Sequence, residues 1–379
     1  MSVLLDGSHA QVRNRLDRSL FVAFVSVGLV GVAMIYSATR DPLLAAGDDP
    51  AFYLKRQLIF VSLGVVVMYL ISRIDIRRLE IVTTPFYVAS VLSLIAVRFF
   101  GSSALGAQRW FDLKLFQVQP SEFAVLALIL SVATYCARRP EGLVMRDVGR
   151  MLCMAALPLI LIFFQPDLGT VIIIVLVIAV MLVIAGVPPR LMVTLAVGGI
   201  VVVLLGVYLQ ILHKYQIGRF TAFINQSSST NDPNLQALIY HVSNAKNAIG
   251  AGGITGSGFF HGLQTTLGYV PEQRTDFIFS AIGEQVGFVG SSIVLALLAF
   301  VSFRIFVASR DAKDRLGQLL CVGIFVFFSF SCFQNIGMTM GIMPVTGIPL
   351  PLISYGGSAA IVFFAAGGVV LSVTRRLGS

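Results

Sequence analysis

The stretch of sequence that decides the fold is Pro271-Glu272-Gln273-Arg274-Thr275-Asp276-Phe277-Ile278-Phe279-Ser280-Ala281-Ile282-Gly283-Glu284. Charged side chains crowd up to Asp276, and a long apolar segment begins directly after it. Carboxylates at membrane depth are costly, so they usually face a protein interior or a wet cavity and are candidates for function. An N-cap by Thr275 or Asp276 explains one acid of this group. It does not explain Glu272, Asp276 and Glu284 together, so the stretch predicts an acidic site at the mouth of a membrane-spanning helix.

Composition places the whole chain in the membrane. The 379 residues are 57% hydrophobic and 12% charged, about half the charged fraction of a soluble domain. Apolar runs of bilayer-spanning length recur from end to end. They predict an all-α polytopic membrane protein with about ten spans, near Ser19–Ala38, Gln57–Ser72, Ile81–Phe100, Ser121–Ala137, Met151–Phe164, Leu168–Gly186, Leu191–Leu212, Phe277–Ser309, Gly317–Met340 and Gly357–Thr374.

Basic residues predict the orientation of these spans. Arginine clusters before the first span, and further clusters follow every second span through to Arg375 and Arg376. By the positive-inside rule these clusters are cytoplasmic, so both termini are expected on the cytoplasmic side. We expect a single domain over 1–379 with one long outer loop, 213–275. The net charge of +9 then reflects topology, and no nucleic-acid partner is expected.

The predicted outer face gathers the unusual residues. Its first loop carries Arg109, Trp110 and Lys114, and the next helix begins with Glu122. Asp167 follows at the next break on this face. Each residue also has a structural interpretation: Trp110 as a membrane-belt residue, Glu122 as a carboxylate favoured by the helix dipole, and Asp167 as a cap.

The long outer loop contains two further signals. Asp232-Pro233 predicts a helix start, and the apolar spacing after it suits either a helix lying in the membrane interface or a buried surface helix. The glycine-rich segment 250–258 either lets backbone N–H groups approach a phosphate or a sugar, or acts as a hinge. The four cysteines and four histidines show no disulfide framework or metal-ligand spacing.

Carboxylates and cations on one face suit one kind of chemistry, which is sugar transfer from a pyrophosphate-linked donor. One acid takes a proton from the acceptor hydroxyl, and basic side chains neutralise the leaving pyrophosphate. A polyprenyl tail on the donor explains an active face that is embedded in a bilayer.

Several motifs carry a family resemblance. They are Arg109-Trp110, Gln119-Pro120-Ser121-Glu122, Gln165-Pro166-Asp167-Leu168-Gly169-Thr170, Asn247-Ala248-Ile249-Gly250-Ala251-Gly252-Gly253, Pro271 to Phe279, Gly283-Glu284, Asn335-Ile336-Gly337-Met338, Pro344-Val345-Thr346-Gly347 and Ser354-Tyr355-Gly356-Gly357-Ser358. With these motifs the chain resembles the SEDS family (shape, elongation, division and sporulation), and its RodA-like branch of peptidoglycan glycosyltransferases most.

The resemblance implies an enzyme of the bacterial cytoplasmic membrane that polymerises lipid II on the outer face during cell elongation. It implies Asp276 as general base on the acceptor hydroxyl. Membrane lipids and a class B penicillin-binding protein, a transpeptidase, are the other implied partners. Candidate substrate-binding residues are Arg109, Trp110, Lys114, Glu122, Asp167, Lys246, Arg274, Glu284, Ser354 and Ser358. A divalent cation (Mg²⁺ or Mn²⁺) could sit beside the pyrophosphate, although no carboxylate spacing demands one.

One residue departs from the family pattern. The position three residues after Glu122 is usually lysine in the family, and here it is Val125. Lys114 or Arg109 is a candidate to replace that cation. Two alternatives to the polymerase stay open: a flippase for the lipid-linked precursor, and a non-catalytic scaffold for the penicillin-binding protein.

Overall fold

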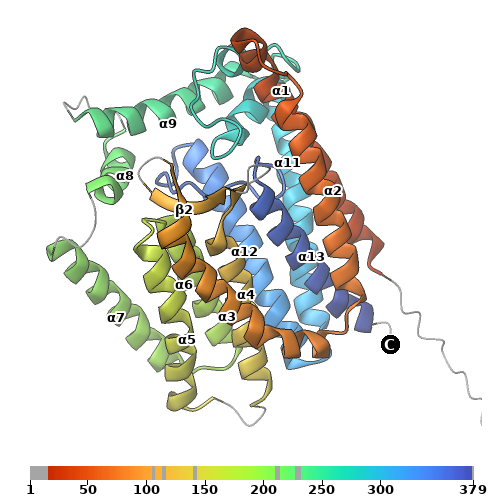
Figure 1. The fold of residues 1–379 in the computed structure, drawn as a ribbon, viewed down its shortest axis with the longest axis vertical. Helices are drawn as coiled ribbons and strands as arrows, with labels where there is room; N and C mark the ends of the chain where they lie inside the picture. Colours follow the sequence, from red (N-terminus) through yellow and green to blue (C-terminus); the bar gives the residue numbers. More distant parts are fainter. Residues whose placement is uncertain are drawn as a thin grey trace, which may run out of the picture.

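The computed structural model describes residues 16–104, 107–112, 117–139, 143–209, 214–226 and 232–377. Each of the ten predicted segments is helical over most of its described residues, which confirms the prediction of a polytopic all-α membrane protein (Figure 1). The helices are α1 (Arg18–Ala46), α2 (Phe52–Arg73), α3 (Ile76–Phe100), α4 (Pro120–Ala137), α5 (Met145–Phe163), α6 (Leu168–Ile184), α7 (Pro189–Tyr208), α11 (Ile278–Asp311), α12 (Arg315–Thr339) and α13 (Gly357–Leu377). Among the described residues, eight of these helices are long and apolar enough to cross a membrane. Of the remaining two, α6 is a shorter apolar helix and α5 packs beside it.

Aromatic and small residues hold the centre of the bundle together. Phe24 of α1 packs against Phe328 of α12 and Phe364 of α13, with ring centroids 5.9 and 6.3 Å away. A Cβ on Gly31 of α1 would lie 2.6 Å from the carbonyl oxygen of Leu352. Only glycine therefore lets the segment between α12 and α13 run deep against α1, which is how small residues act in membrane helix packing.

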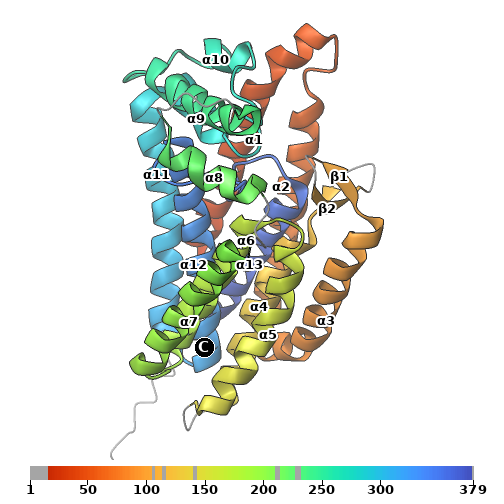
Figure 2. The same ribbon diagram turned by 90° about the vertical axis from the view of Figure 1, so that its left-hand side faces the viewer.

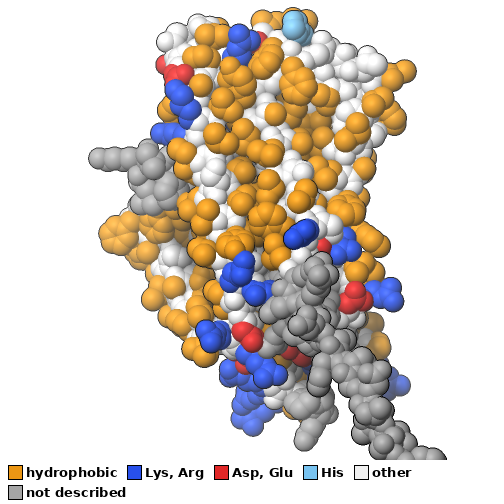
Figure 3. Space-filling view, turned by 90° about the vertical axis from the view of Figure 1, so that its right-hand side faces the viewer, with side chains coloured by type: hydrophobic (Ala, Val, Ile, Leu, Met, Phe, Trp, Pro, Cys, Tyr) orange, Lys and Arg blue, Asp and Glu red, His pale blue; other side chains and the backbone are white. Residues whose placement is uncertain are grey.

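Helix α7 stands apart from this core. Figures 1 and 2 both show it at the edge of the bundle. None of its residues, all of which the structure describes, is buried. Figure 3 shows apolar side chains across the middle of another side of the molecule, with basic side chains gathered towards one end.

The segment predicted as a long loop folds into three helices across one end of the bundle (Figure 2), namely α8 (Lys214–Ile224), α9 (Pro233–Ala251) and α10 (Leu263–Thr266). Helix α9 starts at Pro233, as predicted. Its residues Val242, Ala245 and Ala248 are buried in one cluster with Phe277 and Met338. This packing favours the buried surface helix over the helix lying free in the interface.

A small antiparallel sheet replaces the loop expected after α3. Its strands are β1 (Ser102–Ala104), β2 (Ala107–Asp112) and β3 (Gln117–Val118), in the order β1-β2-β3. Ser102 pairs with Trp110, and Phe111 pairs with Val118. The sheet is too short to produce a clear alternation in the sequence, and it fixes Arg109 and Trp110 on a rigid strand.

The glycine-rich segment packs backbone against backbone on a break in α11. At Gly287 the chain leaves helical geometry with φ 64°. The N–H of Ser257 donates to the carbonyl of Glu284 at 2.9 Å, and the N–H of Phe288 donates to the carbonyl of Gly253 at 2.9 Å. A Cβ on Gly252 would lie 2.0 Å from the carbonyl oxygen of Gly283. Gly252 therefore serves close packing against α11, a role that neither sequence hypothesis named.

Candidate active site

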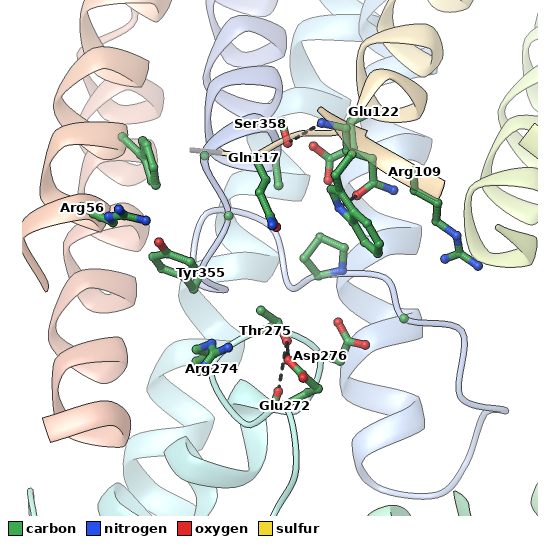
Figure 4. Close-up of a pocket in the computed structure, with 18 of the residues that line it drawn as sticks. Arg56, Arg109, Gln117, Glu122, Glu272, Arg274, Thr275, Asp276, Tyr355 and Ser358 are labelled. Atoms are coloured by element: carbon green, nitrogen blue, oxygen red, sulfur yellow. Dashed lines mark hydrogen bonds between the residues drawn. The ribbon is translucent and has the colours of Figure 1, made fainter. Parts of the chain in front are cut away.

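An open cavity of about 540 Å³ lies where α2, β2, the start of α4, α8, the turn before α11 and the segment between α12 and α13 meet (Figure 4). It brings together six predicted site residues from distant parts of the chain, which are Arg109, Trp110, Glu122, Arg274, Asp276 and Ser358. Its charged lining is balanced: Arg56, Arg109, Arg219 and Arg274 against Asp112, Glu122, Glu272 and Asp276. Such a site can hold an anionic sugar substrate and offer it a carboxylate.

Three successive backbone carbonyls fix the position of Asp276. The carbonyl of Arg274 accepts from the N–H of Tyr355 at 2.8 Å, and that of Thr275 accepts from Ser354 Oγ at 2.6 Å. The carbonyl of Asp276 itself accepts from Asn335 Nδ2 at 2.8 Å. The turn is therefore clamped by α12 and by the segment that follows it, and the carboxylate is held in a fixed direction.

The turn also contains a strained residue. Glu272 has φ 50°, in the left-handed region that a residue with a Cβ rarely adopts. Its carbonyl accepts from the N–H groups of Thr275 and Phe277, and its carboxylate accepts from Thr275 Oγ1 at 3.1 Å (Figure 4). Strain of this kind often marks a functional turn.

The cavity changes the acidity of Asp276. Burial raises the pKa of its carboxyl to about 6, and the negative charge of Glu272 adds to the increase, while Arg219 and Arg109 oppose it. The side chain is partly exposed to the cavity. A Cβ on Gly347 would lie 3.3 Å from Asp276 Oδ2 and 3.8 Å from the Arg219 guanidinium, so Gly347 leaves the space between acid and cation open. A carboxylate with a pKa near neutral is suited to accept a proton.

Glu122 occupies a more apolar part of the cavity. It lines the cavity near Ser358, and among the described residues its buried Oε2 has no hydrogen-bond partner. Val125 is fully buried one turn further along α4 and lines a small void of about 20 Å³ beside Glu122. Arg109 does not replace the missing cation, because its guanidinium donates to the carbonyls of Gln165 (2.6 Å) and Pro166. The other candidate replacement, Lys114, lies outside the described residues.

Asp167 acts as the cap that the sequence allowed. Its carboxylate accepts from the N–H of Thr170 at 3.3 Å, from Thr170 Oγ1 at 2.9 Å and from Ser121 Oγ at 3.2 Å. Gln119 Nε2 also donates to it at 3.1 Å, while Gln119 Oε1 accepts from Trp110 Nε1 at 3.2 Å. Asp167 therefore ties β2, α4 and α6 together without lining the cavity.

Three other predicted substrate-binding residues also lie outside the cavity lining. Glu284 is buried and accepts from the N–H groups of Gln264 (2.7 Å) and Thr265 (2.8 Å), so it anchors α10. Lys246 donates to Gln226 Oε1 at 3.0 Å. Ser354 bridges two backbone segments. Each of these three side chains makes a supporting contact in the walls, and none is part of the cavity lining.

The cavity wall contributed by α2 was not predicted from the sequence. Phe52, Tyr53 and Arg56 line the cavity there, and Tyr355 faces them. One signal was available, because Lys55-Arg56 places two cations on the side that the positive-inside rule leaves poor in basic residues. The described residues contain no group of three or more His, Cys, Asp or Glu side chains that could hold a metal ion.

Fold and cavity together define a multi-pass membrane protein with a charged cavity near one end of its helix bundle. The sequence profile of the FtsW/RodA/SpoVE family of cell cycle proteins matches residues 17–378, and the chain belongs to this family. The peptidoglycan glycosyltransferase MrdB of Escherichia coli K12 is 35% identical, over 94% of this chain and 93% of the relative. A probable peptidoglycan glycosyltransferase FtsW of Haemophilus influenzae is 34% identical, over 95% of this chain and 90% of the relative.

Solved structures show the same fold. A chain from a structure described as "Structural coordination of polymerization and crosslinking by a peptidoglycan synthase complex" superposes with a TM-score of 0.79 at 28% identity, covering 96% of this chain and 98% of that chain. The rod shape determining protein RodA of Thermus thermophilus superposes with a TM-score of 0.69 at 27% identity, covering 95% of this chain and 97% of that chain.

Proposed function

We propose that this protein is a peptidoglycan glycosyltransferase that polymerises lipid II, with Asp276 as general base. The observation that carries the proposal is the clamped Asp276 carboxylate, with a pKa of about 6, facing a cavity lined by four arginines. Membership of the family supports it, because relatives over nearly the whole chain are named as peptidoglycan glycosyltransferases.

In the proposed reaction Asp276 takes the proton from the 4-hydroxyl of the acceptor GlcNAc. The hydroxyl oxygen attacks the anomeric carbon of the donor MurNAc as the bond to the pyrophosphate oxygen breaks. The electron pair leaves with the pyrophosphate, and arginine side chains stabilise that charge. Attack from the face opposite the leaving group converts the α-linked donor into a β-1,4 linkage.

The distribution of charge supports the proposed orientation of the bundle. Helix α1 begins and α13 ends at the same end of the molecule (Figure 1), where basic side chains also gather (Figure 3). By the positive-inside rule that end is cytoplasmic, as are both termini. The cavity and the helices α8 to α10 then lie on the outer face of the bacterial cytoplasmic membrane, where the acceptor and donor are expected.

A class B penicillin-binding protein is the proposed partner. A solved synthase complex that contains a chain of the same fold couples polymerisation to crosslinking. A transpeptidase beside the cavity would crosslink the new glycan strand. A divalent cation on the pyrophosphate is a separate prediction, which glycan formation in EDTA against Mg²⁺ or Mn²⁺ would test.

The decisive experiment measures glycan formation from lipid II by the purified protein, alone and with its cognate transpeptidase. Wild type should form polymer, and Asp276→Ala should reduce the rate at least 10²-fold, the lower end of what a general base contributes. Full activity in Asp276→Ala would refute this assignment. If lipid II crosses vesicle membranes but no glycan forms, the flippase is favoured. If the protein binds the transpeptidase but neither transports nor polymerises lipid II, the scaffold is favoured.

The same assay addresses Val125. Lysine at this position would bring a cation towards the buried Glu122 Oε2, which has no hydrogen-bond partner among the described residues. We expect a higher polymerisation rate in Val125→Lys if the family's usual lysine supports catalysis. Val125→Met is the control, since it fills the small void without adding charge.

A further inference from the structure

The cavity wall formed by α2 and the turn before α11 carries Arg56 and Arg274, to which the proposed reaction gives no individual role. The guanidinium of Arg56 lies 4.3 Å from the centroid of the Phe52 ring, and Arg56 lines the cavity together with Tyr355. Arg274 lies 4.6 Å from the centroid of the Tyr53 ring. Tyr53 and Tyr355 meet edge to face with centroids 5.0 Å apart. Figure 4 shows Arg56, Tyr355 and Arg274 on one side of the cavity and Arg109 on the other.

These two arginines, Arg56 and Arg274, differ from the neighbouring lysine in their charge partners. Within the described part of the chain, no carboxylate lies within 4.0 Å of either guanidinium. The ammonium of Lys55, in contrast, pairs with Asp49 at 2.7 Å. Aromatic faces stabilise a cation, but they leave its N–H donors available to an anion in the cavity.

The surface next to this wall is apolar. Along α2 beyond Arg56, the exposed side chains include Leu58, Ile59, Leu63 and Val66. Helix α2 is long and apolar enough to span the membrane, so these side chains face lipid. A cationic pair at the top of a lipid-facing apolar strip matches an amphiphile with an anionic head and a hydrocarbon tail.

We propose that Arg56 and Arg274, supported by Phe52, Tyr53 and Tyr355, form a subsite for the diphosphate of a polyprenyl-linked substrate, whose chain lies along the exposed side of α2. Arginine suits this role because its planar fork binds phosphate oxygens in pairs and is weakly hydrated. The proposal rests on the proposed function and adds to it the location of one substrate head group, across the cavity from Arg109.

The test measures binding of undecaprenyl pyrophosphate to the full-length protein in nanodiscs. Arg56→Ala should weaken binding about tenfold, as expected for loss of a charge-assisted contact of about 1.4 kcal/mol. Lys55→Ala, the matched control, should stay within about twofold. Tyr355→Phe removes only a hydroxyl from this wall of the cavity, and should weaken binding about threefold. Wild-type affinity in Arg56→Ala overturns the proposal, as does an equal loss in Lys55→Ala.

Competition separates the head group from the tail. Inorganic pyrophosphate should displace the bound lipid only at concentrations at least about 100-fold higher than undecaprenyl pyrophosphate, since burial of apolar chain adds to affinity. Equal potency of the two competitors would overturn the placement of the chain along α2.

The subsite and the activity can fail independently. Asp276→Asn should form no glycan, yet bind undecaprenyl pyrophosphate at least as tightly as wild type, because a negative charge has been removed from the cavity. If wild type forms no glycan while binding still depends on Arg56, the proposed function fails and the subsite stands. If polymerisation is normal and Arg56→Ala binds normally, the subsite fails and the function stands.

Discussion

At the scale of single residues, the best-defined feature is the set of hydrogen bonds that fixes the carboxylate of Asp276. Asp276 sits in a turn whose carbonyls are held by Ser354, Tyr355 and Asn335. Two of these come from the proline-rich segment after α12, which the sequence marks as stiff. The rigid segment therefore acts as a support for the turn, and preorganisation of this kind is what a general base requires.

The raised pKa of Asp276 predicts an acid limit to activity. The proton-accepting form dominates above pH 6, and at pH 5 about nine-tenths of the carboxyl groups are protonated if the pKa is about 6. Initial rates of lipid II polymerisation should therefore be about tenfold lower at pH 5 than at pH 8. Initial rates measured from pH 5 to 8 would check this, and a rate that stays constant down to pH 5 would contradict the role of Asp276.

Asn335 is expected to position Asp276 without touching substrate. Its Nδ2 donates to the carbonyls of both Asp276 and Ile348 at 2.8 Å. Asn335→Ala should lower kcat about tenfold or more, since small misplacements of a catalytic group are costly, while the acid limit of the pH profile stays in place. Gln334→Ala is the control, because Gln334 holds the more distant Pro344 carbonyl. Equal losses in both variants would show a general effect on folding.

At the scale of elements, α11 is shaped by a segment that precedes it in the chain. The residues from Gly252 to Gly258 fill the break at Gly287 with backbone hydrogen bonds. Glu284 lies beside this break and anchors α10. The glycine-rich segment was visible in the sequence, but the break in α11 on which it packs was not. A backbone contact between two segments about 30 residues apart in the chain produces no hydrophobic periodicity, so it could not be predicted from the sequence.

Alanine substitutions within this segment should distinguish a glycine needed for close backbone packing from one that is not. A Cβ on Gly252 would lie 2.0 Å from the Gly283 carbonyl oxygen, whereas a Cβ on Gly250 would meet nothing within 4 Å. Gly252→Ala should destabilise the protein by about 2 kcal/mol, because overpacking forces the backbone apart. Gly250→Ala should leave stability unchanged or slightly higher, through helix propensity. Thermal unfolding in detergent measures both, and equal melting temperatures would contradict the close packing.

At the scale of the whole molecule, the sequence was sufficient for the helix bundle and insufficient for the cavity. Hydropathy predicts the ten helical segments, and eight of these helices, among the described residues, are long and apolar enough to cross a bilayer. Asp276 and Arg109 stood out because charge is rare in so apolar a chain. Arg56, on the α2 wall, could not be placed by the same reasoning, since only three-dimensional packing brings that wall opposite the turn before α11. Glu284 and Lys246 are charged residues that stood out in the same way. Their hydrogen bonds, however, support neighbouring elements and do not face the cavity.

Orientation is the remaining property that belongs to the whole molecule, and it decides whether the cavity can meet its substrate. Asp48 is exposed beyond the end of α1, at the end of the bundle assigned to the outer face, and Gly149 lies in α5 near the opposite end with open space around its Cβ. In a Cys153→Ala background, which removes the exposed native thiol, Asp48→Cys should react with a membrane-impermeant maleimide in intact spheroplasts. Gly149→Cys should react only after the membrane is opened. The reverse pattern would place Asp276 on the cytoplasmic side and exclude polymerisation of lipid II on the outer face, so this labelling tests the topology on which the proposed reaction depends.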